Sequence, residues 1–151
     1  MNNVVYTFPR GVPGFENIRE FELLTPEEPS PFAYLRAVGE SGVCFLVADP
    51  FAFFPDYEFE LGDDAKAELD LAEGREGDVQ VWAIVTVPEN VRETTVNLLA
   101  PVVLNTRSRL GKQVILHDSR YAVKCPLFVP RGSAAEPIQT DAGERASERG
   151  R

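Results

Sequence analysis

The sequence of 151 residues predicts a mainly β protein, a small antiparallel β-barrel-like domain with one short helix at about residues 64–73. Eight short segments have the residue patterns of strands, and proline- or glycine-containing turns separate them. Only one segment has the spacing of a helix. The strands are strongly apolar, so closing the sheet on itself would remove exposed edges that favour aggregation.

Four of the strand patterns lie in the first third of the chain. Residues 4–8 are the first, and Pro9 ends them. In residues 19–24, acidic and apolar side chains alternate with the period of a half-buried strand. Residues 32–38 and 43–48 flank a hairpin-length connection that has glycine at each end.

A strand and the helix are expected next. Residues 57–61 alternate aromatic or apolar side chains with glutamates, which predicts a strand. In the segment DAKAELDLAE, residues 64–73, an aspartate at 63 or 64 can cap the helix, and Ala65, Leu69 and Ala72 share one face. A helix of about ten residues is marginal alone in water, so we expect it to lie against the sheet.

The remaining strands follow in the second half. Residues 79–87, VQVWAIVTV, are apolar on both faces and predict a central strand. Residues 94–105 also have strand character, but Pro101 lacks a donor and predicts a bulge, an edge or a break. Residues 112–117 form the last predicted strand. We expect one folded domain over residues 1–130, and a disordered tail over residues 131–151, where small polar and charged residues predominate.

The negative charge is concentrated in one part of the chain. The formal net charge of the whole chain is −9, and residues 49–78 carry eleven acids and two bases, which is also −9. Such a field repels nucleic acid and attracts a basic partner. Charge alone is equally compatible with a solubilising surface.

The residues that usually carry catalysis or metal binding are scarce. His117 is the only histidine, and neither a GxSxG motif nor a phosphate-binding glycine loop is present. Cys44 lies in the apolar run VCFLVA, where we expect it in the core, and we expect Cys125 to be a free thiol. We therefore predict no catalytic residue, no metal site and no cofactor. Without a long apolar run or a secretory signal, we expect a cytoplasmic protein that contacts neither membrane nor nucleic acid.

Residues 49–61, DPFAFFPDYEFEL, combine five aromatic rings with four carboxylates. One interpretation places the rings in the core and the acids in water. Another is a docking surface for a protein partner, because interfaces are rich in aromatic residues. A third is acid–base hydrolysis of the glycosidase type by Asp56, Glu58 and Glu60. The alternation with apolar residues favours a solvated face over catalysis.

The predicted partner-binding residues come from this segment and from two asparagines that would flank a second face. They are Phe51, Phe53, Phe54, Asp56, Tyr57, Glu58, Glu60, Asn97 and Asn105. For the phenylalanines the competing interpretation is core packing. For the asparagines it is hydrogen bonding to backbone at bulges or turns.

Four strings resemble the bacterial flagellar assembly factor FliW family. They are GVPGFE at residues 11–16, FLVADPFAFFPDYEFEL at 45–61, WAIVTVPE at 82–89 and NLLAPVVLNTRSRLGKQVIL at 97–116. The resemblance runs from about residue 8 to residue 127. Val12 departs from the usual leucine or isoleucine, and Cys125 stands where a basic residue is more usual.

The resemblance implies a small β-barrel-like cytoplasmic protein that is not an enzyme and binds two partners in turn. One is newly made flagellin. The other is CsrA, an RNA-binding repressor of flagellin translation, which the protein antagonises when flagellin has been exported. An alternative function within the family is a flagellin chaperone without a role in translation. An alternative from another class of protein is a small acid–base hydrolase. We expect a monomer when no partner is bound.

Overall fold

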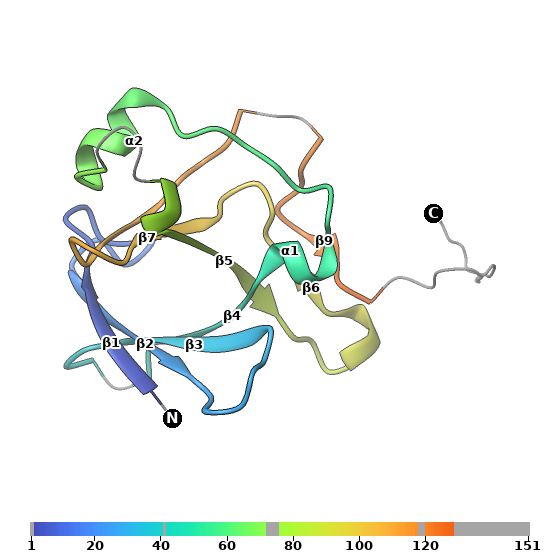
Figure 1. The fold of residues 1–151 in the computed structure, drawn as a ribbon. Coiled ribbons are helices and arrows are strands. Elements are labelled where there is room, and N and C mark those ends of the chain that lie inside the picture. Colours follow the sequence, from blue (N-terminus) through green and yellow to red (C-terminus); the bar gives the residue numbers. More distant parts are fainter. Residues whose placement is uncertain (1, 41, 72–75, 118–119, 129–151) are drawn as a thin grey trace.

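The structure is a computed structural model that describes residues 2–40, 42–71, 76–117 and 120–128. The predicted tail at 131–151 lies outside these residues. The described chain forms nine strands, two short α-helices and two 3-10 helices, η1 and η2 (Figure 1). In chain order they are β1 (Asn2–Thr7), β2 (Glu20–Thr25), β3 (Phe32–Ala37), β4 (Cys44–Ala48), α1 (Pro50–Phe53), α2 (Asp63–Glu68), η1 (Glu76–Asp78), β5 (Val79–Thr86), η2 (Val91–Glu93), β6 (Thr95–Val96), β7 (Val102–Asn105), β8 (Leu110–Gln113) and β9 (Cys125–Pro126).

Seven strands close into a barrel. Their order is β4-β3-β2-β1-β8-β7-β5, and a pairing between β4 and β5 completes the ring. The pairings are antiparallel except at one point, where β1 meets β8 in parallel. β6 and β9 continue the sheet from β5, and with α1 they lie to one side of the ring (Figure 1). The prediction of a mainly β, barrel-like fold is confirmed.

One hydrophobic cluster lies inside the barrel, and we call it the inner core. Alternate residues of the strands point inward, as the period of two requires. The cluster is centred on Tyr6, Phe8, Phe21, Leu35 and Val47, all of them buried. Gly111 of β8 makes room for it, because a Cβ there would stand 2.5 Å from the Phe8 ring.

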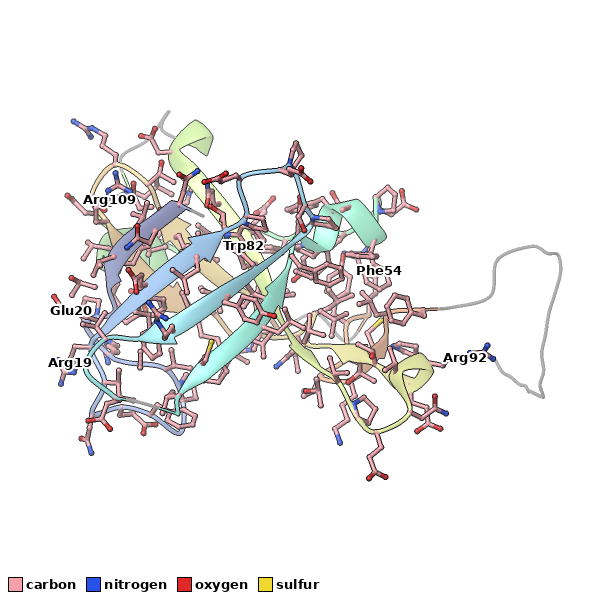
Figure 2. All side chains as sticks on the ribbon, turned by 90° about the horizontal axis from the view of Figure 1, so that it is seen from below. Arg19, Glu20, Phe54, Trp82, Arg92 and Arg109 are labelled. Carbon is pink, nitrogen blue, oxygen red and sulfur yellow. The ribbon has the colours of Figure 1, made fainter. Side chains whose placement is uncertain are left out.

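A second cluster lies on the outside of the barrel wall, and we call it the outer core. Its buried members are Ala48, Tyr57, Ala83, Val85, Val96, Leu98, Leu116 and Leu127. The segment between β4 and α2 covers this part of the wall and supplies the half-buried rings of Phe53, Phe54 and Phe59. In Figure 2, Phe54 lies beside α1, away from Trp82 among the barrel strands.

β5 stands between the two cores. Trp82 and Ile84 pack against the inner core, while Val81, Ala83 and Val85 belong to the outer core. The prediction of a central strand that is apolar on both faces is thereby confirmed. The inner face of β5 is buried because the barrel closes around it. The outer face is buried because the segment between β4 and α2 covers it.

The predicted strand at residues 57–61 is wrong. The segment forms no strand with any described residue: the Tyr57 N–H bonds the Phe54 carbonyl shortly before it in the chain, and a side chain bonds the Glu58 backbone. The Tyr121 hydroxyl accepts from the Glu58 N–H at 3.1 Å and donates to the Glu58 carbonyl at 3.0 Å. Alternation here has a different cause, since Tyr57 and Phe59 face the outer core and the glutamates face solvent.

Three further expectations need correction. The helix predicted at 64–73 is α2, which begins at Asp63 after a Gly62 cap and ends at Glu68; residues 72 and 73 lie outside the described chain. The sequence analysis predicted one helix, and α1 is a second. Cys44, at the start of β4, is exposed rather than buried. The break expected at Pro101 is confirmed, since it separates β6 from β7.

Candidate functional site

A short helix presents the first aromatic residue of the candidate site. The Asp49 carboxylate accepts the Phe51 N–H at 3.0 Å and caps α1, and Pro50 occupies the first helical position, where its missing N–H costs nothing. The cap turns the chain outward, so the Phe51 side chain remains 43% exposed. Its ring lies 5.6 Å from the Tyr57 ring.

Tyr57 anchors the segment to the barrel wall. It is only 4% exposed, and its hydroxyl donates to the Leu98 carbonyl at 2.7 Å. Its ring meets the Tyr121 ring edge-on, with centroids 4.8 Å apart. Burial, and secondarily the neighbouring Tyr121, raises the pKa of Tyr57 well above its usual value. Tyr57 therefore stays neutral and positions the exposed residues around it.

The exposed members of the predicted set lie together on this anchored segment. We call Phe51, Asp56, Glu58 and Glu60 the aromatic–acidic patch; all four are exposed. Phe53 and Phe54 are half-buried, and the Phe53 ring packs on Phe32 at 5.4 Å. The core interpretation thus applies to most of the rings, whereas Phe51 is exposed and its predicted docking role stays a prediction.

A groove of about 470 Å³ runs beside the patch. Apolar residues from the segment and from β5 line much of it, including Phe51, Phe59 and Val81. Glu58 and Glu60 also line it, with Lys66 of α2. An apolar surface with mostly acidic neighbours suits a partner segment that has an apolar face and basic flanks.

The two predicted asparagines hold backbone in place. The Asn97 side-chain oxygen accepts from the Leu99 and Ala100 N–H groups at 3.1 and 3.0 Å. Asn105 is 3% exposed; it donates to the Leu69 carbonyl at 2.8 Å, which ties the end of α2 to the barrel. Its oxygen accepts from Arg107 N–H at 2.9 Å. These bonds fit the competing interpretation given for both residues.

The described residues offer little for catalysis. Among them no group of three or more histidine, cysteine or acidic side chains could hold a metal ion. Asp56, Glu58 and Glu60 are exposed to solvent, whereas a carboxyl that acts as a general acid is usually buried among apolar groups. No helix in the described part of the chain is long and apolar enough to cross a membrane.

Sequence reasoning missed the residues that hold the patch in place. Tyr121 contacts both Tyr57 and Glu58, although 63 residues separate it from Glu58 along the chain. No local pattern signals such a contact. The cap of α1 did have a signal, because aspartate followed by proline is typical of a helix start.

Known proteins resemble this chain over most of its length. A family model described as FliW protein matches residues 1–127. A flagellar assembly factor FliW from Bacillus licheniformis is 47% identical over 120 residues, which cover 80% of this chain and 82% of that protein. One from Desulfitobacterium hafniense is 43% identical over 124 residues, covering 82% and 80%. A crystal structure of the flagellar assembly factor FliW has a TM-score of 0.77 and 38% identity, and covers 84% of this chain and 87% of that one. This chain therefore belongs to the FliW family.

Proposed function

We propose that this protein is a flagellar assembly factor that works by binding other proteins and catalyses no reaction. It binds flagellin, and when free of flagellin it binds CsrA and relieves repression of flagellin translation. The observation that carries the flagellar role is the match to flagellar assembly factors over about four fifths of the chain. We further propose that it acts in the cytoplasm and is a monomer between complexes.

The aromatic–acidic patch is the proposed contact surface. An amphipathic helix from flagellin would lay its apolar face into the groove beside Phe51, a common mode of peptide recognition. Tyr57 is buried and hydrogen-bonded, so it holds the exposed residues of the patch in place before a partner binds. Such preorganisation lowers the entropic cost of binding.

The charge of the same surface suits the second partner. Residues 49–78 carry a net charge of −9, and Asp56, Glu58 and Glu60 are exposed among them. Such a field speeds encounter with a basic RNA-binding protein more than it tightens the final complex. Two partners that share or couple sites need only differ in affinity, and coupling of about 1–3 kcal/mol is typical.

One competition experiment tests the proposal. Purified flagellin is added to a preformed complex of this protein with CsrA, and release of CsrA is followed by size-exclusion chromatography. We expect release at stoichiometric flagellin. If the protein forms no complex with either partner, the proposal is wrong.

A pair of variants tests the surface. Phe51→Ala removes the exposed ring of the patch, and we expect partner affinity to fall at least about tenfold. Tyr34→Ala is the matched control, because Tyr34 is an aromatic residue of similar exposure, 47%, on β3. Equal losses of partner affinity in both variants would show that the patch is not the contact surface, but would not contradict the proposed function.

The second candidate is a flagellin chaperone with no role in translation. Measuring flagellin translation in a deletion strain, with and without CsrA, distinguishes the two. Reduced translation that is restored by removing CsrA supports the regulator, whereas unchanged translation supports the chaperone alone.

A further inference from the structure

The residues that follow β8 form their backbone hydrogen bonds on one side. Beyond the end of β8, the Val114 N–H donates to the Pro101 carbonyl at 2.9 Å, and the Leu116 N–H donates to the Leu99 carbonyl at 2.8 Å. The backbone N–H groups of even-numbered residues therefore continue to bond on the side of β7. In an extended chain the N–H and C=O of one residue point to the same edge, and those of the next residue point to the opposite edge. The backbone groups of residues 113, 115 and 117 therefore face away from β7.

That opposite edge is open. β1 approaches it only at the start of β8, where Thr7 pairs with Leu110 and the Thr7 N–H donates to the Arg109 carbonyl at 2.8 Å. Further along, no residue in the described ranges hydrogen-bonds the backbone of Ile115 or His117. The Ile115 side chain is also 58% exposed. An open edge with an exposed apolar residue is a template for strand addition.

The edge lies in a groove of about 1010 Å³, which shares only Phe59 and Glu60 with the groove beside Phe51. One wall is formed by residues 112–117 and the other by residues between Phe59 and Ala65. Five extended residues span about 16 Å at roughly 3.3 Å each, which sets the length of peptide that this edge accepts.

The wall opposite the edge is acidic. Glu60, Asp63 and Asp64 line the groove and are exposed. Lys112 also lines this groove, but its ammonium group bonds the Glu68 carboxylate at 2.7 Å and not one of these three acids. None of the three acids forms an ion pair with a described residue.

We propose that this groove binds an extended basic segment of a partner protein, which adds to the sheet as a strand beside residues 113–117. Side chains of an added strand alternate, so lysine or arginine at every second position would face the acidic wall and apolar residues would lie beside Ile115. A second copy of this chain is a poor occupant, because it would bring one acidic wall against another. The two grooves share Phe59 and Glu60, but this inference requires neither the Phe51 ring nor the identity of the partners.

Binding of designed peptides tests the charge requirement. The probes are a labelled octapeptide in which lysine alternates with valine and its counterpart with glutamate in place of lysine, and anisotropy of the label is measured against protein concentration. We expect saturable binding of the lysine peptide, at least tenfold tighter than that of the glutamate peptide. Charge neutralisation by Glu60→Gln, Asp63→Asn and Asp64→Asn together should remove most of that difference. Equal binding of the two peptides would overturn the proposal.

Substitutions at one position test the edge itself. Ile115→Pro removes the outward N–H, which has no partner among the described residues, so stability should change little. Ile115→Ala is the matched control, because it also loses the side chain but keeps the N–H. We expect the proline variant to bind the lysine peptide at least tenfold more weakly than the alanine variant. Equal affinities would overturn strand addition.

Amide hydrogen exchange provides a readout that does not depend on any variant folding. In the free protein the Ile115 amide should exchange quickly, while those of Val114 and Leu116 are protected. The lysine peptide should slow exchange at Ile115 at least tenfold, and Phe51→Ala should leave this effect intact. No protection at Ile115 on saturation, or a dimer of the free protein that Ile115→Pro dissociates, would contradict the proposal.

Discussion

The inner and outer cores bury similar kinds of side chain but are closed by different means. Hydrogen-bonded strands surround the inner core on all sides. The outer core has the barrel wall on one side only, and its cover is an extended segment held by individual side-chain bonds such as that from Tyr57 to Leu98. We therefore expect the inner core to contribute most to global stability and the outer core to open at lower free energy. Binding surfaces are commonly built on the less stable parts of a fold.

The largest effect should come from emptying the inner core. Phe21 is fully buried, and Phe21→Ala should lower the free energy of unfolding by about 3–5 kcal/mol, measured by urea denaturation. Phe51→Ala at the outer edge should cost less than about 1 kcal/mol, because the ring is already half in water. Similar losses in the two variants would show that the cores do not differ as we describe.

The next effect comes from overfilling the inner core. Gly111→Ala places a methyl group against Phe8 and Leu104, both buried, and should cost about 1–3 kcal/mol. Gly77→Ala is the control, because apart from its chain neighbours no atom of the described residues lies within 4 Å of the added methyl group. Thermal unfolding followed by circular dichroism compares the two. An unchanged midpoint for Gly111→Ala would mean that the ring of Phe8 can move aside.

A smaller effect should follow from loosening the cover of the outer core. Tyr57→Phe leaves the Leu98 carbonyl without its hydroxyl donor and should cost about 1–2 kcal/mol. Tyr34→Phe is the control at an exposed position. Hydrogen exchange should also rise at the Tyr57 amide more than in the strands around Phe21. A uniform rise across both cores would indicate that they unfold as one unit.

The smallest effect concerns an ion pair outside both cores. The hydrogen bond from Lys112 lowers the pKa of Glu68, with Arg10 adding to it. A lowered pKa means that the pair stabilises the fold above the ordinary pKa of a glutamate, and that this contribution is lost as pH falls through the folded-state pKa. Lys112→Gln should therefore reduce stability by less than about 1 kcal/mol at pH 7 and by almost nothing near pH 2. Lys66→Gln, which removes a charge from α2 itself, should show no such pH dependence.

The sequence predicted the fold well because strand alternation is a local property. Several strands followed from the period of apolar residues, and the central position of β5 followed from its two apolar faces. Pro101 predicted a bulge, an edge or a break, and a break is found. The strand predicted at residues 112–117 is wrong in its bounds, since β8 spans Leu110–Gln113. Residues 57–61 show the limit of this reasoning. They alternate as a strand does, but alternation reports only which side chains are buried, and Tyr121 rather than a neighbouring strand bonds their backbone.

The candidate site was less predictable for the same reason. The aromatic and acidic residues of the patch are adjacent in sequence, so their grouping followed directly. Which ring would be exposed depended on the cap of α1 and on Leu98, whose carbonyl lies 41 residues from Tyr57 along the chain. Cys44 was placed in the core because its neighbours are apolar, yet it begins β4 and is exposed. Long-range contacts of this kind leave no trace in a local pattern.

The position of β5 between the two cores limits which mutations this chain can tolerate during evolution. Successive residues of β5 point to opposite sides of the barrel wall. Deleting one residue after Ala83 would reverse the facing of those before it, so that Val81 and Ala83 would point inward and Trp82 outward. Conservative substitutions there alter one side at a time. Insertions and deletions should accordingly be tolerated in the loops that flank β5 and rejected within it.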